Sequence, residues 1–138
     1  MAVRKNWNLV HNLGSKAVWT DGFRDDFQYR DLGIEKGTGG AFAAHLVRAK
    51  PGHEGDDIHE WHVLDCSFQM VLVLEGWARF EYEGHEGECI IRKDDCILQP
   101  AGLKHRELSC SEDFECLEVI SPADFGTRDV APPPGFDQ

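Results

Sequence analysis

The feature that most constrains the fold of this chain is a succession of short segments with strand-like composition. Between Trp77 and Glu83, for example, Ala78, Phe80 and Tyr82 alternate with charged residues, so one face of a strand would be buried and the other wet. Helix-length amphipathic runs are almost absent, and Gly, Asp and Glu separate the segments. The predicted strands are residues 41–49, 59–64, 68–75, 77–83, 88–92, 96–99, 105–110 and 114–120. Segments of this length and spacing predict an all-β antiparallel sandwich or barrel.

Composition is typical of a globular protein and argues against several classes of partner. Hydrophobic residues make up 41% of the 138 residues, enough for one domain of this length to build a core. The formal net charge is -11, so the chain lacks the basic footprint that phosphate backbones and anionic membranes require. We therefore expect neither a nucleic-acid nor a membrane partner. The longest aliphatic run, MVLVL, is too short to cross a bilayer, and we expect no signal peptide at the N-terminus.

Cysteine usage bears on the compartment. The chain has an odd number of cysteines, and no two of them form a Cys-x-x-Cys pair, which argues against a disulfide framework and against a zinc ribbon. The five are Cys66, Cys89, Cys96, Cys110 and Cys116. We expect free thiols in a reducing compartment, and hence a cytoplasmic protein.

The predicted strands divide the chain into three parts. Residues 40–122 contain all of them and are expected to form one barrel. Residues 1–39 carry too many aromatic side chains for a free arm, so we expect them to pack on the barrel or on a dimer partner. Residues 123–138 include three successive prolines, which cannot donate ladder hydrogen bonds. We expect a C-terminal tail there, with the packed fold ending near Val130.

The turn between two predicted strands carries the most specific motif. Pro100 and Gly102 interrupt the apolar run that ends at Leu98, and His105 follows three residues after the glycine. Proline and glycine at this spacing predict a tight turn. A histidine placed directly after such a turn suggests that the turn aims His105 at a site.

This motif and one earlier in the chain resemble those of the cupins. "PAGLKH" has the spacing of the second cupin motif, Pro-x-Gly-x-x-His, and six residues separate Gln69 from Gly76, as they separate the Glu and Gly that end the first. The resemblance covers residues 40–122 and indicates a small single-domain cupin of the type-2 conserved-barrel family. It implies a double-stranded β-helix, or jelly-roll barrel, with an N-terminal extension. It also implies a homodimer, because small cupins commonly pair and pairing covers an exposed sheet edge.

The resemblance also implies a metal site. In cupins, two histidines in a His-x-His pattern, one glutamate and the second-motif histidine typically bind a divalent metal inside the barrel, since residues i and i+2 of a strand share a face. The metal-ligand candidates here are His62, Gln69 and His105, which would line a pocket together with Leu64. Leu64 stands in place of the second histidine, and Gln69 offers one neutral oxygen in place of a carboxylate. The resemblance therefore implies a partly degraded site with one weakly held divalent metal, such as Ni, Zn, Fe or Mn.

Two residues near the start of this motif are candidates to replace the missing ligands. Glu60 lies two residues before His62, so in a regular strand it shares the inward face and is a possible additional ligand. The alternative is a solvated side chain at a strand start. His59 has the opposite phase and would reach inward only through a bulge, so we expect it to be solvated.

Three further polar residues lie within predicted strands. We expect His45 to be a hydrogen-bonded core or rim residue, because it sits in an apolar strand. Glu107 shares strand phase with His105, and Glu107 or Glu118 could act as an acid or base if it faced inward. On a sheet with one wet face, an outward charge is the expected position for each.

Three functional hypotheses remain open. The first is a small-molecule-binding cupin whose barrel pocket holds an optional metal. The second is a metal-dependent cupin enzyme of the dioxygenase, isomerase or decarboxylase type, acting on a small organic acid or a sugar-like substrate, with Glu60 or water replacing the lost ligands. The third is a metal-free enzyme that uses His62 or His105 as a general base. The fold alone does not discriminate among these hypotheses, because proteins with this barrel have many different activities.

Overall fold

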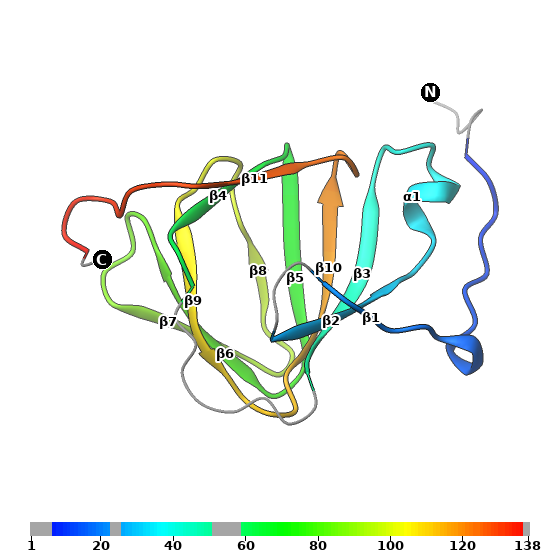
Figure 1. Ribbon diagram of the computed structural model, residues 1–138, viewed down its shortest axis with the longest axis horizontal. Helices are drawn as coiled ribbons and strands as arrows, with labels where there is room; N and C mark the ends of the chain where they lie inside the picture. The colour runs from blue at the N-terminus through cyan, green and yellow to red at the C-terminus, as the bar shows by residue number, and fades with distance from the viewer. Residues whose placement is uncertain (1–6, 23–25, 51–58, 137–138) are drawn as a thin grey trace.

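The computed structural model of the chain describes residues 7–22, 26–50 and 59–136. Within these residues the fold is built from two antiparallel sheets that face each other (Figure 1). One helix, α1 (Ile34–Gly37), and one 3₁₀ turn, η1 (Gly14–Lys16), are the helical elements of the described part. No helix in that part has the length and apolar character needed to cross a membrane. The predicted all-β, jelly-roll architecture is confirmed.

The larger sheet has six strands in the order β1-β2-β3-β10-β5-β8, and the smaller has five in the order β11-β4-β9-β6-β7. The six are β1 (Thr20–Asp21), β2 (Phe27–Asp31), β3 (Ala43–Ala49), β10 (Glu115–Ser121), β5 (Phe68–Glu75) and β8 (Cys96–Leu98). The five are β11 (Gly126–Asp129), β4 (His62–Asp65), β9 (His105–Cys110), β6 (Trp77–Tyr82) and β7 (Glu88–Arg92). Strands that are distant in sequence are neighbours in both sheets, as in a jelly roll.

The N-terminal segment contributes strands to the barrel. β2 pairs with β3, with Phe27 opposite Ala49, and β1 then pairs with β2. Further out, the Arg48 guanidinium lies over the Trp19 ring at 3.9 Å, and Trp7 packs edge-on against Phe42. The six-stranded sheet therefore begins before the predicted barrel boundary at residue 40.

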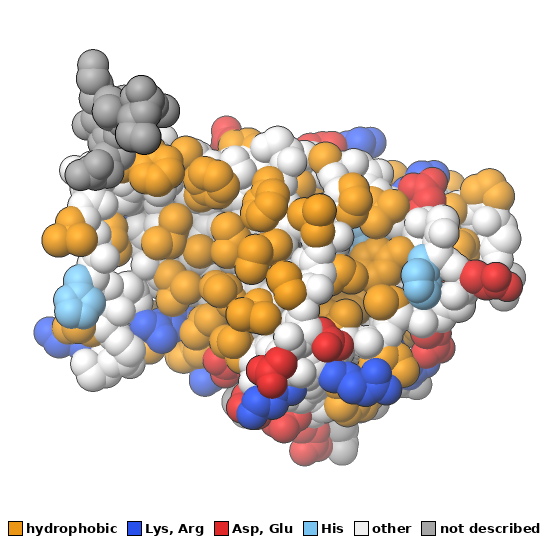
Figure 2. Space-filling model, turned by 180° about the vertical axis from the view of Figure 1, so that it is seen from behind, with side chains coloured by type: hydrophobic (Ala, Val, Ile, Leu, Met, Phe, Trp, Pro, Cys, Tyr) orange, Lys and Arg blue, Asp and Glu red, His pale blue; other side chains and the backbone are white. Residues whose placement is uncertain are grey.

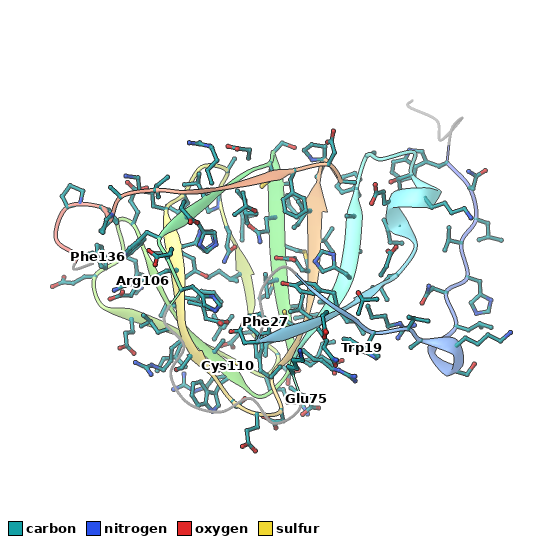
Figure 3. The ribbon with its side chains drawn as sticks, viewed as in Figure 1. Trp19, Phe27, Glu75, Arg106, Cys110 and Phe136 are labelled. Atoms are coloured by element: carbon teal, nitrogen blue, oxygen red, sulfur yellow. The ribbon has the colours of Figure 1, made fainter. Side chains whose placement is uncertain are left out.

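The C-terminal segment is also packed, because β11 pairs with β4 and the chain then covers the outside of the smaller sheet. The Phe136 ring contacts the Trp61 ring with centroids 4.8 Å apart, and the Arg106 guanidinium lies 5.1 Å from the centre of that indole. Figure 3 shows Arg106 and Phe136 on the same side of the barrel. The expectation that the packed fold ends near Val130 is wrong, because Phe136, beyond the prolines, packs against the buried Trp61 indole.

The hydrophobic core fills only part of the space between the sheets. Its buried members come from both sheets and from the loop before β10: Phe27, Val47, Ala49, Val71, Val73, Ala78, Ile91, Phe114 and Cys116. Several of these residues also line a cavity, so the apolar cluster forms one of its walls. Buried polar side chains, among them His62, Gln69, His105 and Glu107, lie beside this apolar cluster and line the same cavity.

Gly76 provides a test of how tightly the turn between β5 and β6 is packed. Its φ is +72°, and a Cβ there would lie 2.2 Å from Ser111 Oγ and 2.9 Å from Phe114 Cα. We expect Gly76→Ala to destabilise the protein by about 3 kcal/mol, through left-handed strain and overpacking together. Gly84→Ala is the matched control, since its φ is +79° but nothing lies within 4 Å of the added Cβ. It should cost about 1 kcal/mol in urea unfolding. Equal losses for the two variants would contradict the crowding at Ser111.

Candidate functional site

A cavity of about 300 Å³ lies between the two sheets. Aromatic and aliphatic side chains form much of its lining, and a limited number of polar side chains converge on it. The polar side chains are His45, His59, His62, Gln69, Gln99, His105, Glu107, Glu118 and Thr127, with Tyr29 beside them. A concave space with apolar walls and a few convergent polar groups is the usual form of a small-molecule site.

His62 and His105 lie next to each other on neighbouring strands of the smaller sheet. They are paired residues of β4 and β9, and their ring centroids are 4.3 Å apart. His62 Nδ1 lies 2.9 Å from the Glu60 carbonyl oxygen, and His105 Nδ1 lies 2.9 Å from that of Leu103. Because a carbonyl only accepts hydrogen bonds, each Nδ1 donates, and the neutral ring then carries its lone pair on Nε2. Histidines that bind metals are usually oriented in this way.

Gln69, on the opposite sheet, belongs to a hydrogen-bonded chain of three side chains. Its Nε2 donates to Glu118 Oε2 at 2.7 Å, and Glu118 Oε1 lies 2.5 Å from His45 Nε2. The expected hydrogen-bonded role of His45 is confirmed. The expectation that Glu118 faces outward is wrong, since it shares the cavity face of β10 with Cys116 and Ile120. Gln69 therefore has its Oε1 as the group it could offer to a metal.

A second polar group joins the two sheets at Asp26, His59 and Glu107. His59 Nε2 lies 2.9 Å from Asp26 Oδ2, and His59 Nδ1 lies 3.7 Å from Glu107 Oε2. The His59 side chain is only 9% exposed, so the expectation that it is solvated is wrong. The reason is that β4 begins at His62, which frees His59 from strand phase and lets its backbone N–H bond to the Glu107 carbonyl.

Glu107 is also placed differently from the expectation. It is 5% exposed and lines the cavity, because it follows His105 by two residues on β9 and so shares its face of the strand. Asp26 was missed altogether, since one acidic residue before an apolar strand carries no signal of burial. The one signal in the sequence for this cluster is that Glu107 lies two residues after His105, so that both share one face of the strand.

The residues named by the cupin pattern all lie on the cavity wall. His62, Leu64, Gln69 and His105 line it, whereas the Glu60 side chain is exposed and does not. Glu60 precedes the start of β4, so the shared strand phase that made it a possible ligand is absent, and only its backbone carbonyl contacts His62. The wall thus offers two oriented imidazoles and one amide oxygen, which fit part of a metal coordination shell. That these residues bind a metal stays a prediction.

Two further side chains shape the chemistry of the cavity. Burial raises the pKa of the Cys116 thiol well above its usual value, and Glu118 adds to this effect, so Cys116 serves as an apolar lining group. Gln99 is buried and donates from Nε2 to the Tyr82 hydroxyl at 2.8 Å. Its Oε1 has no hydrogen-bond partner among the described residues. A buried acceptor on a cavity wall is a point at which a ligand can donate a hydrogen bond.

Comparison with known proteins identifies the fold. No family model matches the chain, and no curated protein matches it in sequence. Solved structures do match: KdgF from Halomonas sp. is 18% identical with a TM-score of 0.59, over 82% of this chain and 94% of that one. The polyketide cyclase RemF from Streptomyces resistomycificus is 14% identical with a TM-score of 0.65, over 92% and 87%.

A third match carries the superfamily name. A sugar phosphate isomerase from the cupin superfamily, from Silicibacter pomeroyi, is 24% identical with a TM-score of 0.55. The match covers 70% of this chain and 60% of that one. Together with the motif spacing and the two facing sheets, these likenesses show that the chain has the fold of a small cupin domain.

Proposed function

We propose that this chain binds a small hydroxyl-bearing organic molecule in the barrel cavity, with a divalent metal held weakly by His62, Gln69 and His105. The cavity of about 300 Å³ between the two sheets is the observation that carries the proposal. Its volume is at the lower end of the range for small-molecule sites, and its mixture of apolar walls and convergent polar groups is typical of them.

The polar groups of the wall favour a ligand that donates hydrogen bonds. Gln99 Oε1 is a buried acceptor, and the carboxylates of Glu107 and Glu118 add further acceptors. No lysine or arginine lines the cavity within the described part of the chain. A carboxylate ligand would therefore lack a permanent cationic partner, whereas sugar-like hydroxyls match the acceptors.

The metal would be held by the two oriented imidazoles and the Gln69 amide oxygen. The Nδ1 hydrogen bonds to Glu60 and Leu103 fix the rings and direct Nε2 to the ion. When bound, such an ion polarises a ligand oxygen. A ligand set without a charged member and without a donor at Leu64 supports weak binding rather than a permanent metal centre.

The alternative is a metal-dependent enzyme that acts on a small organic acid or a sugar-like substrate. Two of the proteins with this fold are named as a sugar phosphate isomerase and a polyketide cyclase, at identities that relate the folds alone. For an acid substrate, the cavity would depend on the bound metal to supply the missing positive charge. Carboxylate binding that disappears on metal removal would favour this alternative.

The ligand test uses calorimetry with monosaccharides, polyols and small carboxylic acids on chelator-treated protein. We expect hydroxylated compounds to bind without metal, and Gln99→Leu to weaken that binding at least tenfold, about 1.4 kcal/mol. Gln28→Leu is the control, because Gln28 bonds to Arg48 and does not line the cavity. The proposal fails if no hydroxylated compound binds, or if the two variants bind equally well.

We further propose a homodimer formed through the outer face of the larger sheet. Side chains that alternate with the cavity residues form two apolar rows across four strands of that sheet, in register. The rows consist of Leu46, Met70, Leu72, Cys96, Leu98, Leu117 and Val119, together with Ala44, which is only 7% exposed, and Figure 2 shows hydrophobic side chains gathered over this face. The solvent face of an antiparallel sheet is usually polar.

A second copy is the partner that this face fits best. Each chain has a formal net charge of -11, so two copies repel overall, but none of the eight residues is charged and the contact itself would add no pair of like charges. A two-fold contact would bring the same apolar face of each copy together. We also propose a cytoplasmic location, on the basis of the unpaired cysteines, and neither nucleic acid nor membrane as a partner, on the basis of the acidic charge.

A further inference from the structure

The Asp26, His59 and Glu107 side chains form a compact cluster outside the cupin metal position. Each offers one ligand atom, and these atoms lie within 4.8 Å of one another. The Asp26 and Glu107 side chains are 3% and 6% exposed. They come from opposite sheets, since Asp26 directly precedes β2 and Glu107 lies on β9, while His59 lies in the segment before β4. The cluster therefore depends on the closed barrel.

The composition of the cluster suits a divalent cation. Two carboxylates and one imidazole provide hard oxygen ligands and a nitrogen of intermediate softness, a combination that Mn²⁺ and Zn²⁺ accept. Two carboxylates this close in a buried site repel each other, and the His59 imidazole, which contacts both of them, offsets part of that repulsion. A shared divalent ion would relieve this repulsion and bind both of them.

The cluster also opens toward the ligand site. His59 and Glu107 line the cavity, so an ion bound between them would have coordination positions that face the cavity. Glu107 follows His105 by two residues on β9, which places its Cα about 7 Å further along the same face. An ion there would lie beside the cupin position, against a different part of a bound molecule.

We propose that Asp26, His59 and Glu107 form a divalent-cation site in the barrel, distinct from the position of His62, Gln69 and His105. The site uses none of the residues of the proposed weak metal position and does not depend on it. The alternative is a purely structural role, in which the contacts of His59 hold the segment before β4 against β2 and β9. That role would affect stability but would not bind metal.

The test is a titration with Mn²⁺, followed by the electron paramagnetic resonance signal of the free aqueous ion, on protein stripped with chelator. We expect the parent to bind Mn²⁺ and Asp26→Asn/Glu107→Gln to bind it at least tenfold more weakly, because both changes keep the volume and remove the charges. His62→Ala/His105→Ala removes the proposed weak position, so it should keep the tighter Mn²⁺ site with an affinity within about twofold of the parent. Circular dichroism and thermal unfolding in chelator check that each variant folds.

A second measurement applies if the double variant does not fold. Mn²⁺ broadens the nuclear magnetic resonance signals of nearby protons, so in the parent it should broaden the ring signals of His59, assigned with His59→Gln, more than those of His85, whose side chain is exposed outside the cavity.

Two results would overturn the proposal. One is a parent that binds no Mn²⁺. The other is a pattern in which His62→Ala/His105→Ala abolishes binding while Asp26→Asn/Glu107→Gln retains it, which would assign the ion to the cupin position instead. The ligand titrations on metal-free protein are read separately, so failure of the small-molecule proposal can be told from failure of this one.

Discussion

The triple variant Leu64→His/Gln69→Glu/Glu118→Gln is expected to bind Ni²⁺ at least tenfold more tightly than the parent, a gain of about 1.4 kcal/mol. Leu64→His adds an imidazole on the cavity face of β4, in phase with His62. Gln69→Glu adds a negative charge at almost unchanged volume, and a charge beside a divalent ion in a shielded cavity stabilises it strongly. Ni²⁺ is chosen because imidazole-rich sites suit it.

The third substitution is needed because of a contact that the sequence does not reveal. Gln69 donates to Glu118 Oε2 at 2.7 Å, so a glutamate at position 69 would place two carboxylates in hydrogen-bond contact. Such a pair holds a shared proton, and the new charge is then reduced. Glu118→Gln reverses the hydrogen bond, with the new amide donating to the new carboxylate.

Calorimetry on chelator-stripped proteins decides this prediction. Leu64→His/Gln69→Glu without the third change should gain less than the triple variant, and His105→Ala added to the triple variant should remove most of the gain. If the parent already binds Ni²⁺ as tightly as the triple variant, the cupin position is not degraded. If the triple variant binds no more tightly than the parent, then positions 62, 64, 69 and 105 do not converge on one ion.

The strands and the second-motif turn could be predicted because their signals are local. β5, β7 and β9 have the bounds that period-two patterning predicts. Pro100 and Gly102 form the turn, with Gly102 at φ +75° and the Leu103 amide bonded to the Pro100 carbonyl. His105 then follows at the start of β9, buried on the cavity wall.

The polar interior could not be predicted from the same signals. Hydrophobic alternation assumes that the inner face of a strand is apolar, so it assigns Glu107 and Glu118 to solvent, although both face the cavity. In β10 the two faces have similar apolar content, with Cys116 and Ile120 on one and Leu117 and Val119 on the other. Position in the barrel, and not composition, decides which face of such a strand is inside.

Pairing between distant segments was the other limit. β2 pairs with β3, and β11 pairs with β4. Neither β2 nor β11 is flanked by a turn motif from which its partner strand could be predicted. Asp26 reaches His59 because it directly precedes β2, which is fixed by its pairing with β3. The cluster with His59 and Glu107 is thus a product of long-range topology, which no local pattern in the sequence encodes.

The outer face of the larger sheet gives the second large effect. Leu117→Lys is expected to weaken dimerisation at least a hundredfold, about 2.7 kcal/mol. Leu117 lies at the centre of the apolar rows, opposite Leu46 on one side and Leu72 on the other. Around a two-fold axis both copies would bury the new ammonium group, and burial of an unpaired charge is costly. In the monomer the same lysine would face water on a sheet surface, so folding should change little.

Light scattering coupled to size exclusion, over a range of concentrations, measures this effect. Ile90→Lys is the matched control, because Ile90 is 39% exposed on β7 of the other sheet and carries the same change in charge and polarity. The parent and Ile90→Lys should elute as dimers at concentrations where Leu117→Lys is monomeric. A parent that is monomeric at micromolar concentration would contradict the dimer itself. If Ile90→Lys dissociates the dimer and Leu117→Lys does not, the interface lies on the smaller sheet. A charge placed at the centre of the larger sheet's outer face can leave the affinity unchanged only if that face does not contact the partner.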